Sequence, residues 1–203
     1  MTSSTKSLFA VLALCLALPS YANDLIAEVR ARLAPRPVTQ GEFQQTRELA
    51  RIKKPLVSNG RFLVVRDAGV IWENLAPIVQ TMRITKNEIL QTGGGAALMR
   101  LSSDKEPVVG IISSILFGAL AGDFEMLAQS FTCDGKVEGD KWRLVFKPRD
   151  ATLARLIEAL SLAGGRDIEQ VEIRSAAGDA ARIVFKAQTH ADEVSAEIRK
   201  RFE

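Results

Sequence analysis

The sequence has 203 residues, of which 47% are hydrophobic and 25% are charged, and its formal net charge is +3. This length fits one domain with a sizeable core, and the composition is that of an ordinary soluble protein. The small net charge gives no argument for a nucleic-acid partner, although a pI of about 9.0 permits contact with acidic lipid head groups.

The N-terminus has the pattern of a secretory signal peptide. Lys6 is the only charged residue before Asp24, and residues 8–18 form an unbroken apolar run. Ser20 and Ala22 place small residues at positions −3 and −1 of a cleavage site before Asn23. Eleven apolar residues are too few to cross a bilayer core of about 30 Å. We therefore predict a signal peptide over residues 1–22, a single domain over residues 23–203, and a periplasmic location.

Only two cysteines occur in the chain. Cys15 lies within the predicted signal peptide, and Leu14 before it is not the small residue that a lipoprotein cleavage site needs. Cys133 is then the only cysteine of the mature chain, so no internal disulfide is expected and the core must stabilise the fold unaided.

The first half of the mature chain reads as one helix followed by short strands. Leu25, Ile26, Val29 and Leu33 form one apolar stripe, which predicts a helix over residues 24–33. The period then changes to two, and turn residues separate the segments. Strands are predicted over residues 38–49, 56–65, 70–75, 78–84 and 88–91, with a glycine loop at residues 93–95 that lacks the lysine of a phosphate loop.

Residues 106–129 interrupt the strands with a helical pattern. Ser113 and Ser114 are the only polar side chains between Val108 and Ala121, so this segment must be covered on most of its sides. It is too short for a transmembrane helix. After the break at Gly122, a short second helix is predicted over residues 124–129.

The second half returns to strands. They are predicted over residues 131–137, 141–148, 153–162, 168–175 and 181–188, although the apolar spacing of residues 153–162 also fits a helix. Val194, Ile198 and Phe202 indicate a short terminal helix. The prediction is an α+β fold in which about ten strands form an antiparallel meander, with the apolar helix as a lid over one face.

Catalytic and metal-binding patterns are absent from the sequence. His190 is the only histidine and has no nucleophile or carboxylate at a recognisable spacing. No Cys/His cluster suits zinc and no acidic loop suits calcium. We predict no enzyme activity, no metal and no cofactor, and we interpret Cys133 as a small core residue.

A basic group stands out in the first predicted hairpin. It consists of Arg47, Arg51, Lys53 and Lys54. It can be a solvated hairpin end without a function, or it can meet acidic lipid head groups or an acidic partner. No aromatic residues are interleaved for stacking on bases, so nucleic acid is not an expected partner.

The order of these features resembles the LolA family of periplasmic carriers of outer-membrane lipoproteins. The resemblance covers nearly the whole mature chain. It rests on the sequence GEFQQ at 41–45, GRF at 60–62, Arg66 followed by Trp72, the proline-led strand at 77–85, the mid-chain helices, WRLVFKP at 142–148 and the turn Gly178–Asp179.

The resemblance implies an antiparallel sheet curled into an incomplete β-barrel with a helical lid, without catalytic activity. It implies a monomer that carries acyl chains of lipoproteins or other lipids between an inner-membrane donor and an outer-membrane acceptor. The residues expected to line the lipid site are Phe43, Phe62, Val64, Arg66, Trp72, Met82 and Ile84 on the sheet, and Ile111, Ile112, Ile115, Leu116 and Phe117 on the lid.

Arg66 matches the arginine that gates the lid in this family, but Asp67 stands where the family has proline. By alternation, Arg66 shares a strand face with Phe62 and Val64. A buried guanidinium needs acceptors, so the gating hypothesis predicts that Arg66 donates to lid or loop carbonyls when the lid is closed. The alternative is an arginine in a solvated hairpin turn.

Three functional hypotheses follow. The first is a carrier of acylated proteins, other lipids or a non-protein lipid-linked product. The second is a lipid-sensing or regulatory module of the cell envelope, although the chain has no residues left for the further domain that such regulators carry. The third is a lipid-modifying enzyme, against which the single histidine counts.

Overall fold

A computed structural model describes residues 21–33, 36–102, 120 and 124–203 of the chain. Its helices are α1 (Tyr21–Arg32), α3 (Phe124–Ser130), α4 (Ala151–Ala154) and α5 (Ala196–Lys200). Its strands are β1 (Val38–Leu49), β2 (Ile52–Val65), β3 (Gly69–Ala76), β4 (Gln80–Ile84), β5 (Glu88–Gly93), β6 (Ala96–Ser102), β7 (Phe131–Glu138), β8 (Lys141–Pro148), β9 (Ile157–Gly164), β10 (Ile168–Ser175) and β11 (Ala180–Ala191).

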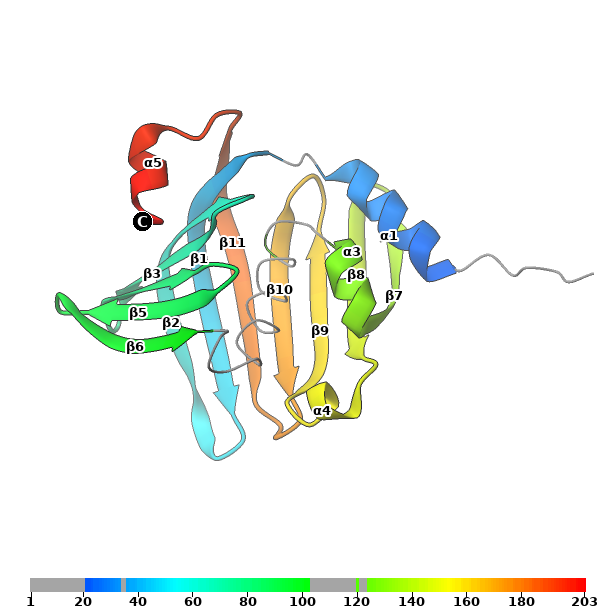
Figure 1. The fold of residues 1–203 in the computed structure, drawn as a ribbon. Helices are drawn as coiled ribbons and strands as arrows, with labels where there is room; N and C mark the ends of the chain where they lie inside the picture. The colour runs from blue at the N-terminus through cyan, green and yellow to red at the C-terminus, as the bar shows by residue number, and fades with distance from the viewer. Residues whose placement is uncertain (1–20, 34–35, 103–119, 121–123) are drawn as a thin grey trace, which may run out of the picture.

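The strands form one curled antiparallel sheet of eleven strands (Figure 1). The order across it is β6-β5-β4-β3-β2-β1-β11-β10-β9-β8-β7. Two meanders, β1–β6 and β7–β11, are therefore joined where β1 pairs with β11, for example at Phe43 opposite Phe185. Among the described strands, β6 and β7 are the two edges of the sheet, so the barrel is incomplete, as the resemblance implied.

Most predicted elements are confirmed. The strands at Val38–Leu49 and Ile168–Ser175 have the predicted bounds, and the helices predicted near residues 24–33 and 124–129 are α1 and α3. The predicted strand 78–84 begins later, at Gln80, because residues 77–79 form the turn after β3.

The strand predicted over residues 153–162 is wrong at its start. Asp150 caps a helical turn, α4, by accepting hydrogen bonds from the backbone N–H groups of Leu153 at 3.1 Å and Thr152 at 2.7 Å. These bonds favour the carboxylate and lower the pKa of Asp150. The strand itself, β9, begins only at Ile157.

Strand β6 was not predicted, and it makes the strand count eleven rather than about ten. The glycine loop is the turn of the β5–β6 hairpin, in which Gly94 and Gly95 adopt φ of +58° and +81°. The first five residues of β6 are exposed, so its sequence carries no alternation of buried and exposed side chains to mark a strand.

Each face of the sheet carries a covered apolar cluster. The inner face carries the main core, and α1 packs against β7 while α3 packs against β7 and β8 (Figure 1). The outer face carries a smaller cluster, Val38, Leu63, Val65 and Ile71, against which Val194, Ile198 and Phe202 pack. Phe62 and Val64 belong to the inner face, so the prediction that residues 62–65 form a strand buried on both faces is confirmed.

The predicted lid helix lies outside the described residues, and with it Ile111, Ile112, Ile115, Leu116 and Phe117. Leu120, near the end of the predicted lid, is described; it is half-buried and packs against the inner-face core. No helix in the described parts of the chain is long and apolar enough to cross a membrane.

Candidate functional site

Four aromatic rings form a group on the inner face of the sheet, on β1, β2, β3 and β11. Phe43 stacks on Trp72 with ring centroids 3.8 Å apart. Phe185 meets Phe62 edge-on at 4.9 Å and Trp72 edge-on at 6.1 Å. Since edge-on and offset arrangements are favourable for aromatic rings, the four rings form a packed surface across the strands that join the two meanders.

Gly60 allows these rings to lie against the backbone. A Cβ atom at this position would lie 1.9 Å from the carbonyl oxygen of Glu73 and 2.6 Å from the ring of Phe43. Phe43 and Gly60 are opposite one another in the β1–β2 register. The glycine therefore makes room for Phe43 to stack on Trp72 in the next strand.

A second aromatic group lies at the other end of the inner face, on α3 and β8. Phe124 meets the rings of Trp142 and Phe146 at 5.8 Å and 6.2 Å. Trp142 also donates from its indole nitrogen to the carbonyl oxygen of Gly165 at 2.7 Å, so its one polar atom is satisfied within the core.

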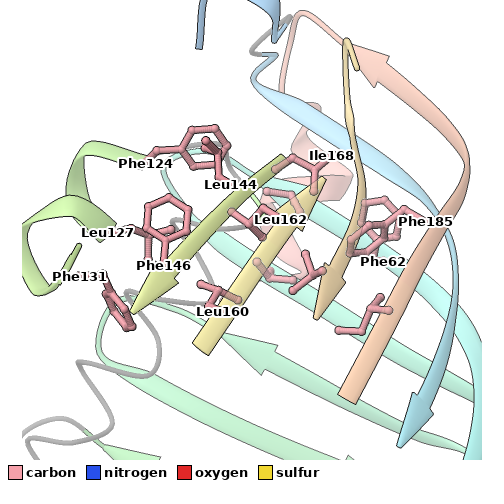
Figure 2. Packing of buried hydrophobic residues seen from close by; sticks show 14 of the residues in the cluster. Phe62, Phe124, Leu127, Phe131, Leu144, Phe146, Leu160, Leu162, Ile168 and Phe185 are labelled. Atoms are coloured by element: carbon pink, nitrogen blue, oxygen red, sulfur yellow. The ribbon is translucent and has the colours of Figure 1, made fainter. Parts of the chain in front are cut away.

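Aliphatic side chains connect the two aromatic groups. Leu144, Leu160 and Leu162, on β8 and β9, are at most 1% exposed. Figure 2 shows them between Phe146 on one side and Phe62 with Phe185 on the other. The inner face is therefore apolar across the sheet, from the strands around β1 to the strands around β8.

The structure brings the sheet residues of the predicted lipid site onto this one face. Phe43, Phe62, Val64, Trp72 and Ile84 are buried there, and Met82 is half-buried and packs against them. Their role in binding lipid stays a prediction.

Sequence reasoning did not assign the other half of the inner face to the site. Its main members are Phe185, Ile183, Leu144, Phe146, Leu160 and Leu162. The alternation of Trp142, Leu144 and Phe146 was visible in the sequence, but only the pairing of β1 with β11 shows that this half continues the surface around Phe43.

Arg66 lies in the turn between β2 and β3 and is exposed. Its backbone N–H donates to the carbonyl oxygen of Pro37 at 3.0 Å. Within the described residues, its guanidinium takes part in no hydrogen bond or ion pair, which is the arrangement of a solvated turn arginine. The lid carbonyls with which Arg66 was expected to bond lie outside the described residues, so its gating role stays a prediction.

His190 has a carboxylate partner that its sequence position did not reveal. Its Nε2 lies 3.0 Å from Asp167 Oδ1, and its Nδ1 lies 3.1 Å from Thr39 Oγ1. Thr39 is opposite both Val64 and His190 in the strand register. The contacts tie the turn between β9 and β10 to β11 and β1 at one end of the sheet.

The outer face contains a polar pocket of about 200 Å³. It surrounds Glu172, which is 8% exposed and accepts hydrogen bonds from Arg174 at 3.1 Å and Arg182 at 3.3 Å. Its lining is charged, so it does not suit an acyl chain. No group of three or more His, Cys, Asp or Glu side chains in the described parts of the chain could hold a metal ion.

Cys133 is half-buried beside the inner-face core. Burial, and then the nearby carboxylate of Asp134, raise the pKa of its thiol to about 11. Because the thiolate is the reactive form, about one thiol in a thousand is reactive at pH 8, and this fraction rises about tenfold for each pH unit up to the pKa.

We therefore expect iodoacetamide to modify Cys133 in the folded protein on the order of a hundredfold more slowly at pH 8 than in the same protein unfolded in urea. Peptide mass spectrometry would locate the label and measure its rate. The labelling rate should rise between pH 8 and pH 10. Rapid labelling of the folded protein at pH 8 would contradict the burial of Cys133 and the raised pKa of its thiol.

Comparison with known proteins gives one family match. The sequence model of the family described as "Outer membrane lipoprotein carrier protein LolA-like" matches residues 19–201. A search of curated proteins finds no match.

Solved structures with a similar fold include a LolA superfamily protein from Nitrosomonas europaea, with 9% identity, a TM-score of 0.48 and coverage of 87% of this chain and 96% of that chain. A putative outer membrane lipoprotein-sorting protein domain from Vibrio parahaemolyticus has 8% identity, a TM-score of 0.48 and coverages of 89% and 97%. MucB in the MucA/MucB complex of Pseudomonas aeruginosa has 16% identity and a TM-score of 0.47, and the coverages are 88% and 60%.

Proposed function

The chain belongs to the LolA-like family of outer membrane lipoprotein carrier proteins, and on this premise we propose that it is a periplasmic carrier of acyl chains. The acyl chains belong to lipoproteins or other lipids, and the protein moves them toward the outer membrane. The observation that carries the proposal is the apolar inner face, which extends from Trp72 to Phe146 on a sheet that does not close into a barrel.

The energetics suit an acyl ligand. Each methylene group removed from water contributes about 0.8 kcal/mol, so a chain of about sixteen carbons gains on the order of 12 kcal/mol. A carrier must also release this ligand. An apolar face covered by helices can be uncovered without unfolding the sheet, and the described helices α1 and α3 contact only part of it, at β7 and β8.

A bound lipid is the first expected result. Native mass spectrometry of protein purified gently from cells that express the full chain should show lipid adducts, and extraction should identify their head groups. A clean mass without lipid, together with failure to take up a fluorescent fatty acid, would overturn the proposal.

Met82→Lys is expected to reduce fatty-acid uptake at least about fivefold, because it places an ammonium group on the apolar inner face. Thr81→Lys is the matched control, since it adds the same charge to the neighbouring position of β4, which points to the opposite face. Both positions are half-buried, and far-UV circular dichroism would verify that both variants fold. Equal uptake by the two variants would exclude the inner face as the site.

A further inference from the structure

The large apolar side chains that are exposed are not spread evenly over the described surface. They are Ile52, Leu56, Val57, Leu75, Ile78, Val79, Leu98, Met99 and Leu156. All except Met99 lie at or beside the β1–β2, β3–β4 and β5–β6 turns or the connection from α4 to β9. Because neighbouring strands are antiparallel throughout, these four connections are at the same end of the sheet.

The opposite end of the sheet is polar. It carries the turns β2–β3, β4–β5, β7–β8 and β9–β10, which include Arg66, Asp67, Lys86, Asp140 and Arg166. Among the described residues, none of the exposed large apolar side chains lies in these turns. Apart from Met99, the exposed large apolar side chains are therefore gathered at one end of the sheet, although the β10–β11 turn at that end is polar. We call this the apolar end and the opposite one the polar end.

The β1–β2 hairpin extends furthest at the apolar end (Figure 1). We call residues 47–57 the hairpin tip. β3 pairs with β2 only from Asn59 onward, so within the described chain residues 52–58 of β2 have β1 on one side and no strand on the other. Ile52, Leu56 and Val57 are 47–49% exposed there.

The hairpin tip is also basic. Arg47, Arg51, Lys53 and Lys54 are all exposed, and none of them forms an ion pair with another described residue. Glu48 is the only acidic residue between Glu42 and Asp67. Lysines alone could be explained as charges that prevent the open edge of β2 from pairing with a strand of another chain. The three exposed apolar side chains beside them would not prevent such pairing, so they need another explanation.

Exposed apolar side chains framed by basic ones suit the interface of an anionic bilayer, where the apolar groups enter the head-group region and the cations stay near the phosphates. We propose that the hairpin tip docks the protein on the surface of an anionic phospholipid membrane. The acidic residues at the same end of the sheet are Glu48, Asp150, Glu158 and Asp179. Glu48 alone lies within the hairpin tip, and the Asp179 carboxylate accepts a hydrogen bond from the N–H of Ala50 at 2.9 Å.

The proposal goes beyond the carrier function and does not depend on which ligand the inner face holds. It assigns an orientation to the membrane contact, with the polar end that carries Arg66 and His190 directed away from the bilayer. The variant Met82→Lys keeps the hairpin tip intact, so it should bind membranes as the unmodified protein does even where it no longer takes up fatty acid.

The test is flotation with vesicles of 70% phosphatidylcholine and 30% phosphatidylglycerol, and with vesicles of phosphatidylcholine alone. The unmodified protein should float with the anionic vesicles and be released by high salt. Lys53→Glu with Lys54→Glu should lower the partition coefficient about tenfold or more, since each lysine near an anionic surface contributes roughly fivefold. Leu56→Ser with Val57→Ser should also weaken binding.

Lys86→Glu with Arg166→Glu is the matched control, because it changes the net charge by the same amount through exposed residues at the polar end. This control should bind the anionic vesicles within about twofold of the unmodified protein. The proposal is overturned if the unmodified protein does not float, or if the control loses as much binding as the hairpin-tip variants. It is equally overturned if sedimentation velocity shows that the tip variants abolish a dimer while vesicle binding is unchanged.

Discussion

Trp72→Ala is expected to lower the free energy of unfolding by about 3–5 kcal/mol, as removal of a large buried aromatic side chain does. The indole is 7% exposed and contacts three other rings: Phe43 in β1, Phe62 in β2 and Phe185 in β11. Its removal leaves a cavity that the neighbouring rings cannot fill, because each is held by its own strand. The strands concerned are those that join the two meanders, so the loss affects the whole sheet.

Urea unfolding followed by far-UV circular dichroism measures this effect without relying on tryptophan fluorescence. Leu75→Ala is the control on the same strand, where the side chain is 46% exposed, and it should change stability by no more than about 0.5 kcal/mol. A loss below about 1 kcal/mol for Trp72→Ala would show that the ring is not packed among the other three.

Ile198→Ser combined with Phe202→Ser is expected to lower the free energy of unfolding by about 2–4 kcal/mol, because both side chains are half-buried on the outer face. They help to cover Leu63, Val65 and Ile71, which are each 3% exposed. The double variant should uncover this cluster while the inner face stays packed. Binding of a dye that reports exposed apolar surface should therefore increase before the protein unfolds.

The matched control is Glu197→Ser with Lys200→Ser, which changes two exposed residues of the same helix. Ser195 should still cap α5 in both variants, since its hydroxyl accepts from the N–H of Ile198 at 3.2 Å. If the control lost as much stability as the apolar variant, the loss would be caused by a change in the stability of the helix itself. Its packing on the outer face would then not be the cause.

Local patterns were sufficient to predict most of the elements. The alternation of side chains within a strand depends only on the geometry of that strand, so residues 62–65 could be read as buried on both faces from sequence alone. The exceptions have local causes. β6 is an exposed strand without alternation, and the turn α4 depends on a cap by Asp150 that the apolar pattern of the following residues concealed.

The candidate site was predictable only in part. Phe43, Phe62, Val64, Trp72, Met82 and Ile84 were assigned from alternation and from the family resemblance, and they do lie on one face. Phe185 and the leucines of β8 and β9 were missed, because no pattern within a strand says which other strand lies beside it. Alternation alone placed Arg66 on the inner face. The structure shows that β2 ends at Val65, so Arg66 lies in the turn that follows and is exposed.

The sequence by itself determined where most of the strands run, which side chains alternate along them, and that an apolar face needs cover. Only the tertiary structure decided that β1 pairs with β11, two strands about 150 residues apart such as at Thr39 and His190. Backbone N–H and C=O groups are the same in every strand and can pair with any neighbour. The choice of partner therefore depends on which arrangement buries all the apolar side chains at once, and that is a property of the whole chain.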